Sequence, residues 1–204
     1  AGGTYGIDAL VELKTENAEL DTIETKGGDI DYVNLATDGK SISIFNAIED
    51  KTITLQLNYK YTYTVTTTNT AGEEITSQKE ETGFVIYTYE IAANIKPKQS
   101  LETQSIISGT SYTGITFDSL QQQNPAVSYS EDFKLTWSAQ DSGLFGTSAI
   151  TMGDDGKIEI TATYVAITTS TTVTLTFTYK NGEKELFTFN VSVPVTIYPA
   201  YRLK

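Results

Sequence analysis

The chain has 204 residues and a net charge of −12, and it contains neither histidine nor cysteine. The absence of histidine excludes an imidazole base, a Ser-His-Asp triad and a histidine-bound metal. The absence of cysteine excludes a thiolate nucleophile, a thiolate zinc site and a disulfide. The acidic balance and the single arginine, Arg202, argue against nucleic acid as a partner, because that binding depends on Lys and Arg at phosphates. No run of 18 apolar residues exists, so we expect no membrane span.

The first predicted strand covers residues 5–14, where apolar and polar side chains alternate. Its apolar face consists of Ile7, Ala9, Val11 and Leu13. Residues 15–28 are polar and end in two glycines, which favours a connection. Weaker strand patterns follow at 29–35 and 41–46.

The clearest strand lies at 52–66, where every odd position is apolar or aromatic and every even position is polar. Strict alternation is typical of an antiparallel sheet with one buried face. Its expected partner is 84–95, and the polar stretch 66–83 between them reads as a long protruding hairpin tip. Tyr59, Tyr61 and Tyr63 could form a sugar-stacking platform, but they share a face with Ile53, Leu55 and Leu57, which favours core packing.

After Pro97 the alternation weakens, and residues 99–130 are either a connector or a pair of short strands. Strand patterns return at residue 133, and Gly153-Asp154-Asp155-Gly156 marks a hairpin turn. The last hairpin has apolar odd positions on both strands, so the numbers of opposed residues must add up to an even value. A three-residue Lys180-Asn181-Gly182 loop satisfies this by pairing Leu175 with Phe187, with Gly182 in a left-handed conformation.

Four segments of the second half carry a resemblance to the bacterial immunoglobulin-like domain. They are Phe133-Lys134-Leu135-Thr136-Trp137-Ser138, Asp141-Ser142-Gly143, the strand 156–163 and the hairpin 171–193. The resemblance covers about 133–197 and implies a β-sandwich that serves as a spacer or scaffold in surface proteins, with Trp137 buried on an early strand. The N-terminal strand, Tyr-rich sheet and protruding hairpin of the first half are similar in layout to pilin-like subunits of extracellular filaments.

We therefore expect an all-β protein with two antiparallel sandwich-like halves and little helix. The expected domains are an N-terminal β domain over 1–98 with the protruding hairpin 66–83, the segment 99–130, and an immunoglobulin-like sandwich over 131–204.

Candidate chemistry is sparse. Asp29, Asp31, Asn34 and Asp38 offer closely spaced oxygen ligands that could hold Ca²⁺, although the spacing fails the EF-hand pattern and an acidic strand edge is the alternative. Asn190-Val191-Ser192 is an N-glycosylation sequon. No pair of carboxylates stands out among the 26 acidic residues, so we expect no catalytic site and no cofactor other than this Ca²⁺.

The favoured function is a structural, non-enzymatic subunit of an extracellular filament or cell-surface layer, secreted with removal of a signal peptide. Its partners would be copies of itself, joined head to tail when the strand carrying Ile7, Ala9, Val11 and Leu13 completes the sheet of the next subunit. The alternative for this strand is an ordinary edge strand of its own sheet. The alternative functions are a carbohydrate-binding or adhesive surface module with surface glycans as partners, a phage or virus structural protein, and a secreted glycosidase.

Overall fold

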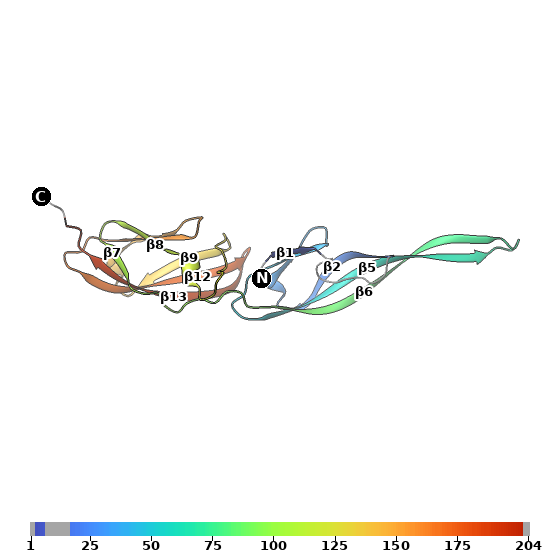
Figure 1. Ribbon diagram of the computed structural model, residues 1–204, viewed down its shortest axis with the longest axis horizontal. Coiled ribbons are helices and arrows are strands. Elements are labelled where there is room, and N and C mark those ends of the chain that lie inside the picture. Colours follow the sequence, from blue (N-terminus) through green and yellow to red (C-terminus); the bar gives the residue numbers. More distant parts are fainter. Residues whose placement is uncertain (1–2, 7–16, 202–204) are drawn as a thin grey trace. The chain divides into compact units, whose positions relative to one another are not determined.

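The computed structural model describes residues 3–6 and 17–201, and it confirms an all-β chain (Figure 1). The chain divides into two compact units, Ala1–Ala93 and Asn94–Lys204. The only helices among the described residues are three short 3-10 turns, and none of these could cross a bilayer. They are η2 (Ile30–Tyr32), η3 (Asp118–Leu120) and η4 (Ser142–Leu144).

The described residues of the first unit form two antiparallel three-stranded sheets, in the orders β1-β4-β3 and β2-β5-β6. Both sheets contribute apolar side chains to the buried core, including Ile42 on one sheet and Ile53, Leu55 and Leu57 on the other. The strands are β1 (Gly3–Gly6), β2 (Ala18–Gly28), β3 (Val33–Leu35), β4 (Ser41–Ile44), β5 (Lys51–Thr68) and β6 (Glu74–Ile91).

Strand β2 occupies most of the segment that was expected to be a connection, so that expectation was wrong for 18–28. Two bulges explain why the alternation is hidden: Asp21 and Lys26 are extra residues between successive pairs with β5. The first bulge lets Leu20 and Ile23, three positions apart, both reach the core, where they are 7% and 2% exposed. A glycine ends the strand because a side chain at Gly28, where φ is +81°, would meet the carbonyl oxygen of Thr52.

The protruding hairpin was predicted correctly in place but not in structure. Strands β5 and β6 pair without interruption from Lys51↔Ile91 to Thr68↔Glu74, so 66–83 is mostly paired ribbon and not a loop. The chain turns between Thr68 and Glu74, and the side chain of Asn69 closes this turn by accepting from the backbone N–H groups of Ala71 and Glu73. The ribbon is exposed on both of its faces, and therefore its sequence has no apolar period that could reveal a strand.

The second unit is a seven-stranded sandwich with sheets in the orders β10-β11-β8 and β7-β13-β12-β9. The first strand, β7, pairs in parallel with the last, β13, while the other pairs are antiparallel. The strands are β7 (Gln104–Ile107), β8 (Ser111–Thr116), β9 (Phe133–Ala139), β10 (Phe145–Met152), β11 (Lys157–Ala162), β12 (Thr169–Asn181) and β13 (Lys184–Tyr198).

The boundary between the units lies after Ala93, whereas the first domain was expected to extend to 98. Of the two alternatives for 99–130, the pair of short strands is the one the structure shows: the segment supplies β7 and β8, one strand for each sheet of the second sandwich. Residues 94–98 are tied to this unit by glutamine side chains, since Gln123 donates to the carbonyl of Asn94 and accepts from the N–H of Lys96.

Aromatic residues fill the core of the second unit. Phe117 lies at the centre, with its ring centroid 4.5 Å from that of Phe133 and 5.4 Å from that of Phe177. Phe177 in turn stacks on Phe189 at 5.2 Å. Trp137, expected to be buried, is half-buried and packs edge-on against Phe145.

The last hairpin keeps the predicted faces but not the predicted register. Leu175 pairs with Val191 and not with Phe187, which lies opposite Tyr179. A bulge after Tyr179 lets odd-numbered residues of the two strands oppose each other from Tyr179↔Phe187 onward. The shared apolar face is therefore compatible with a two-residue loop. The strands are joined by a two-residue loop whose first residue, Gly182, has φ +57° as expected for a left-handed turn position.

Candidate interaction surface

Strands β5 and β6 continue as a two-stranded ribbon beyond the point where β2, the third strand of their sheet, stops pairing with β5. Strand β2 ends its pairing with β5 at Ala18↔Tyr61, and the carbonyl of Asn17 accepts from the N–H of Thr62. Among the described residues, β5 and β6 then pair only with each other as far as the turn (Figure 1). Odd-numbered residues of both strands share one face of the ribbon, and even-numbered residues share the other.

Tyr61 and Tyr63 lie on the odd face, where they are half-buried and do not belong to the core. Their rings stack with centroids 5.7 Å apart, and both hydroxyls donate to the carboxylate of Glu81, at 2.5 and 2.7 Å. These bonds raise the pKa of both phenols, while the two donors, Tyr61 first, lower the pKa of Glu81. The core interpretation was wrong for these two residues, because the apolar period of a strand does not reveal where the opposing sheet ends.

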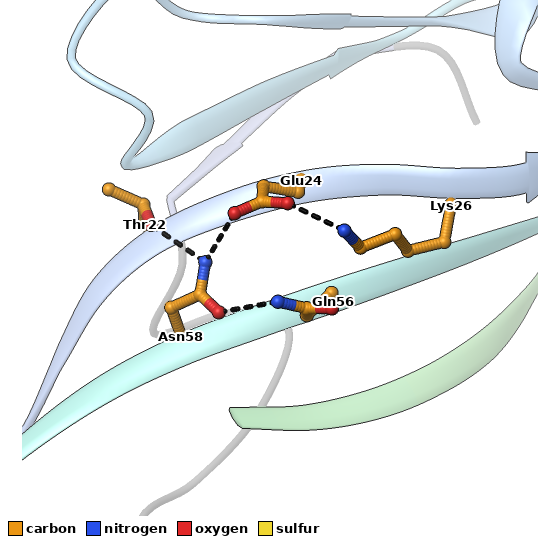
Figure 2. A network of polar contacts seen from close by, with 5 residues as sticks. All are labelled: Thr22, Glu24, Lys26, Gln56 and Asn58. Carbon is orange, nitrogen blue, oxygen red and sulfur yellow. Dashed lines mark hydrogen bonds and ion pairs between the residues drawn. The ribbon is translucent and has the colours of Figure 1, made fainter. Parts of the chain in front are cut away.

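The even face carries a network of polar side chains that spans β2 and β5 (Figure 2). The amide of Asn58 donates to Thr22 at 3.0 Å and to Glu24 at 2.9 Å, and its oxygen accepts from Gln56 at 2.7 Å. Lys26 holds the other oxygen of Glu24 at 2.7 Å. Lys26 and then Asn58 lower the pKa of Glu24, so this carboxylate remains charged at neutral pH.

Beside this network, β6 exposes large apolar side chains. Phe84 and Ile86, on the even face, are 59% and 55% exposed, and Tyr87, on the odd face, is 42% exposed. The stretch 82–89 contains no charged residue in a chain of net charge −12. The apolar face predicted for this strand consists of its odd positions alone. The signal that could have identified Phe84 and Ile86 is that apolar residues occupy both parities from 84 to 87, which makes both faces apolar.

The predicted donor residues Ile7, Ala9, Val11 and Leu13 lie outside the described residues. The part of the N-terminal segment that is described, β1, forms four pairs with β4 of the same chain, from Gly3↔Ile44 to Gly6↔Ser41. Of these four residues, Tyr5 is half-buried and the other three are exposed.

Two of the four predicted calcium ligands accept hydrogen bonds from backbone N–H groups. Asp29 accepts from the N–H of Thr52 at 2.9 Å, and Asp38 accepts from the N–H of Lys40 at 2.9 Å. Asp31 lies in η2 and Asn34 in β3. Within residues 3–6 and 17–201, no group of three or more acidic side chains is arranged to hold a metal ion. Calcium binding by these residues stays a prediction.

Asn190 lies in β13 on the outer face of its sheet, where it is exposed. Its side-chain oxygen accepts from Thr176, the residue directly opposite on β12, at 2.8 Å. Its amide nitrogen is the atom that a glycan would modify. Glycosylation of Asn190 stays a prediction.

Comparisons with known proteins show likeness only at the level of the fold. No protein-family model matches the chain, and no curated protein matches it. The first two cadherin repeats of human mucin-like protocadherin align over 91% of this chain and 85% of that one, with 10% identity and a TM-score of 0.33.

A second solved structure is a SusE-like surface-located polysaccharide-binding protein from the heparin utilisation locus of Bacteroides thetaiotaomicron. It aligns over 90% of this chain and 29% of that one, with 15% identity and a TM-score of 0.26. Cadherin domains 3–6 of protocadherin gamma B2 align over 88% of this chain and 43% of that one, with 9% identity and a TM-score of 0.31. Likeness at this level gives no information on what the chain binds.

Proposed function

We propose that the chain is a non-enzymatic structural subunit of an extracellular filament or cell-surface layer. The observation that supports this proposal is the β5–β6 ribbon, which runs past its own sheet and exposes side chains on both faces. A two-stranded ribbon buries little apolar surface and is only marginally stable alone. Contact with another surface would therefore stabilise it, and a structural subunit supplies such surfaces in its neighbours.

Head-to-tail assembly would use the N-terminal strand, with Ile7, Ala9, Val11 and Leu13 inserted into the next subunit. Such a contact does not close on itself and so produces a filament. Donation requires β1 to leave β4. Three of the four β1 residues are exposed and only Tyr5 is half-buried, so little apolar burial of β1 itself opposes the exchange.

The test is negative-stain electron microscopy of the full chain and of variants in the N-terminal strand. Ile7→Lys and Val11→Lys place charge on the donated face and should abolish filaments. Glu12→Lys changes the charge on the opposite face of the same strand and should leave filaments intact. Filaments that persist in both apolar-face variants would contradict strand donation, and a chain that is monomeric under all conditions would contradict the filament itself.

A second candidate is an adhesive or carbohydrate-binding surface module. The observation in its favour is the Tyr61–Tyr63–Glu81 group, because aromatic rings and a charged acceptor are groups that contact sugars through stacking and hydroxyl hydrogen bonds. A glycan array checks this candidate. Tyr63→Ala should remove any binding, whereas Tyr164→Ala, which removes an exposed tyrosine of the second unit, should not.

A further inference from the structure

The free edge of β6 can be read residue by residue from the hydrogen bonds of its neighbours. At the turn the N–H of Asn69 donates to the carbonyl of Glu73, so this odd-numbered pair is a hydrogen-bonded one. Hydrogen-bonded pairs recur at every second residue, and odd residues of β6 therefore bond to β5. Consistently, the even residues Thr52 and Thr62 of β5 bond toward β2 and the residues flanking it.

The backbone groups of the even residues of β6 consequently point away from β5. Phe84 and Ile86 thus present N–H and C=O groups at an edge where no strand among the described residues is paired. The same two residues expose most of their apolar side chains. The stretch 82–89 is uncharged, free of proline and rich in aromatic and β-branched residues, which is the composition of segments that pair with other chains.

A second copy of β6 fits this edge in antiparallel orientation. Opposed residues must have their side chains on the same face, so the two residue numbers of each pair must add up to an even value. The two-fold axis therefore passes through a residue and not between two residues. An axis at Val85 would place Glu80 opposite Glu90, which is unfavourable. An axis at Ile86 would pair only residues 81–91.

An axis at Phe84 pairs residues 77–91 and brings the two Phe84 side chains together on the even face. Every charged residue of the paired stretch then lies opposite an uncharged residue of the other copy. These pairs are Lys79 with Tyr89, Glu80 with Thr88, Glu81 with Tyr87 and Glu90 with Gln78. The edge can therefore pair with a second copy of itself in hydrogen bonding without placing like charges directly opposite each other.

We propose that two copies of the chain associate through the free edges of β6, antiparallel about a two-fold axis at Phe84. The contact joins two β2-β5-β6 sheets into one continuous sheet and covers Phe84 and Ile86. Such a contact is closed and uses the same surface on both copies. It does not depend on strand donation, and it would give a filament subunit a lateral contact in addition to the head-to-tail one.

The chain contains no cysteine, so single-cysteine variants of the 204-residue chain report the register directly. Residues on the axis form a hydrogen-bonded pair with Cα atoms about 5.5 Å apart, within the range that a disulfide spans. Two copies of residue 86 would lie about 14 Å apart, four residues along the strands, and could not be bridged. Under mild oxidation we expect Phe84→Cys to give a covalent dimer on a non-reducing gel and Ile86→Cys to stay monomeric.

Ile167→Cys is the control for random encounter, since Ile167 is 74% exposed and lies in the second unit. A dimer from Ile86→Cys alone, equal dimer from all three variants, or no dimer from Phe84→Cys would each overturn the proposal. Repeating the Phe84→Cys experiment with Ile7→Lys separates the two contacts: the cross-link should persist where head-to-tail assembly is lost.

Sedimentation of the cysteine-free chain provides an independent measurement. Ile86→Lys adds a charge at the paired edge on an exposed position, so the fold is retained while self-association should weaken at least tenfold. Ile167→Lys should leave self-association unchanged. Equal association of the Ile86→Lys variant and the unaltered chain would also overturn the proposal.

Discussion

Replacing Leu55 by alanine tests whether the two units are stabilised separately. Leu55 is fully buried in β5, where it pairs with Thr25 of β2 and Tyr87 of β6. Large-to-small changes at such positions cost about 2–5 kcal/mol, because transfer free energy is lost and a cavity remains. Taking about 3 kcal/mol as the central value, and about 5 °C per kcal/mol for a unit of this size, we expect the melting temperature of the first unit to fall by about 15 °C.

Differential scanning calorimetry of the full chain is the assay. The chain divides at Ala93, and we expect two transitions, of which Leu55→Ala shifts one. Leu175→Ala is the matched change in the second unit: Leu175 is also fully buried, between Trp137 and Val191, and it should shift only the other transition. A single transition that both variants lower equally would refute the separate cores, and a shift below about 3 °C for Leu55→Ala would refute its burial.

Four further predictions follow from local structure. Gly28→Ala should lower the first transition by about 10 °C, because the new Cβ would meet the carbonyl of Thr52 at a φ of +81°; an unchanged transition would contradict that geometry. The lowered pKa of Glu81 means that its bonds to Tyr61 and Tyr63 contribute fully above its ordinary pKa and are lost as pH falls through the folded-state pKa. In a ¹³C NMR titration the Tyr61→Phe/Tyr63→Phe variant should return this pKa toward its ordinary value, and an identical titration curve would show that the phenols are not the cause. Bound Ca²⁺ at Asp29, Asp31, Asn34 and Asp38 should raise the first transition reversibly with EDTA, whereas Asp154→Asn in a turn of the second unit should not alter that response; a first transition insensitive to both Ca²⁺ and EDTA would argue against the site. Secretion from a eukaryotic host should add a glycan mass that Ser192→Ala removes, and a chain of unmodified mass would show Asn190 to be unoccupied.

Strand positions in the sheet interiors could be predicted from the sequence because burial on one face imposes a period of two. Residues 53, 55 and 57 are the core positions of β5, and Phe177 and Phe189 are core positions of the last hairpin, as the alternation required. Parity also predicted that Leu175 would oppose an odd residue of β13. It could not decide which one, since the register is set by where the loop lies and by the bulge after Tyr179, and neither can be read from the alternation.

The candidate surface on the β5–β6 ribbon was harder to predict, because the exposure of its residues depends on which other strands pack beside them. Tyr61 and Tyr63 continue the alternation of Leu55 and Leu57, but they are half-buried and lie at and beyond Ala18↔Tyr61, the last pair between β2 and β5. The polar stretch 66–83 reads as a loop because neither face of the ribbon is buried.

Residue types and a period of two were enough to predict the all-β class, the faces of the regular strands, and the lack of histidine and cysteine chemistry. Three features required the folded chain: 18–28 is a strand, 99–130 completes the second sandwich, and β6 is an edge strand among the described residues, with Phe84 and Ile86 exposed. The partner of a strand and the extent of the layer that covers it depend on residues that are distant in the sequence. The alternation along a strand indicates which of its faces is buried, but it does not indicate where the covering sheet ends.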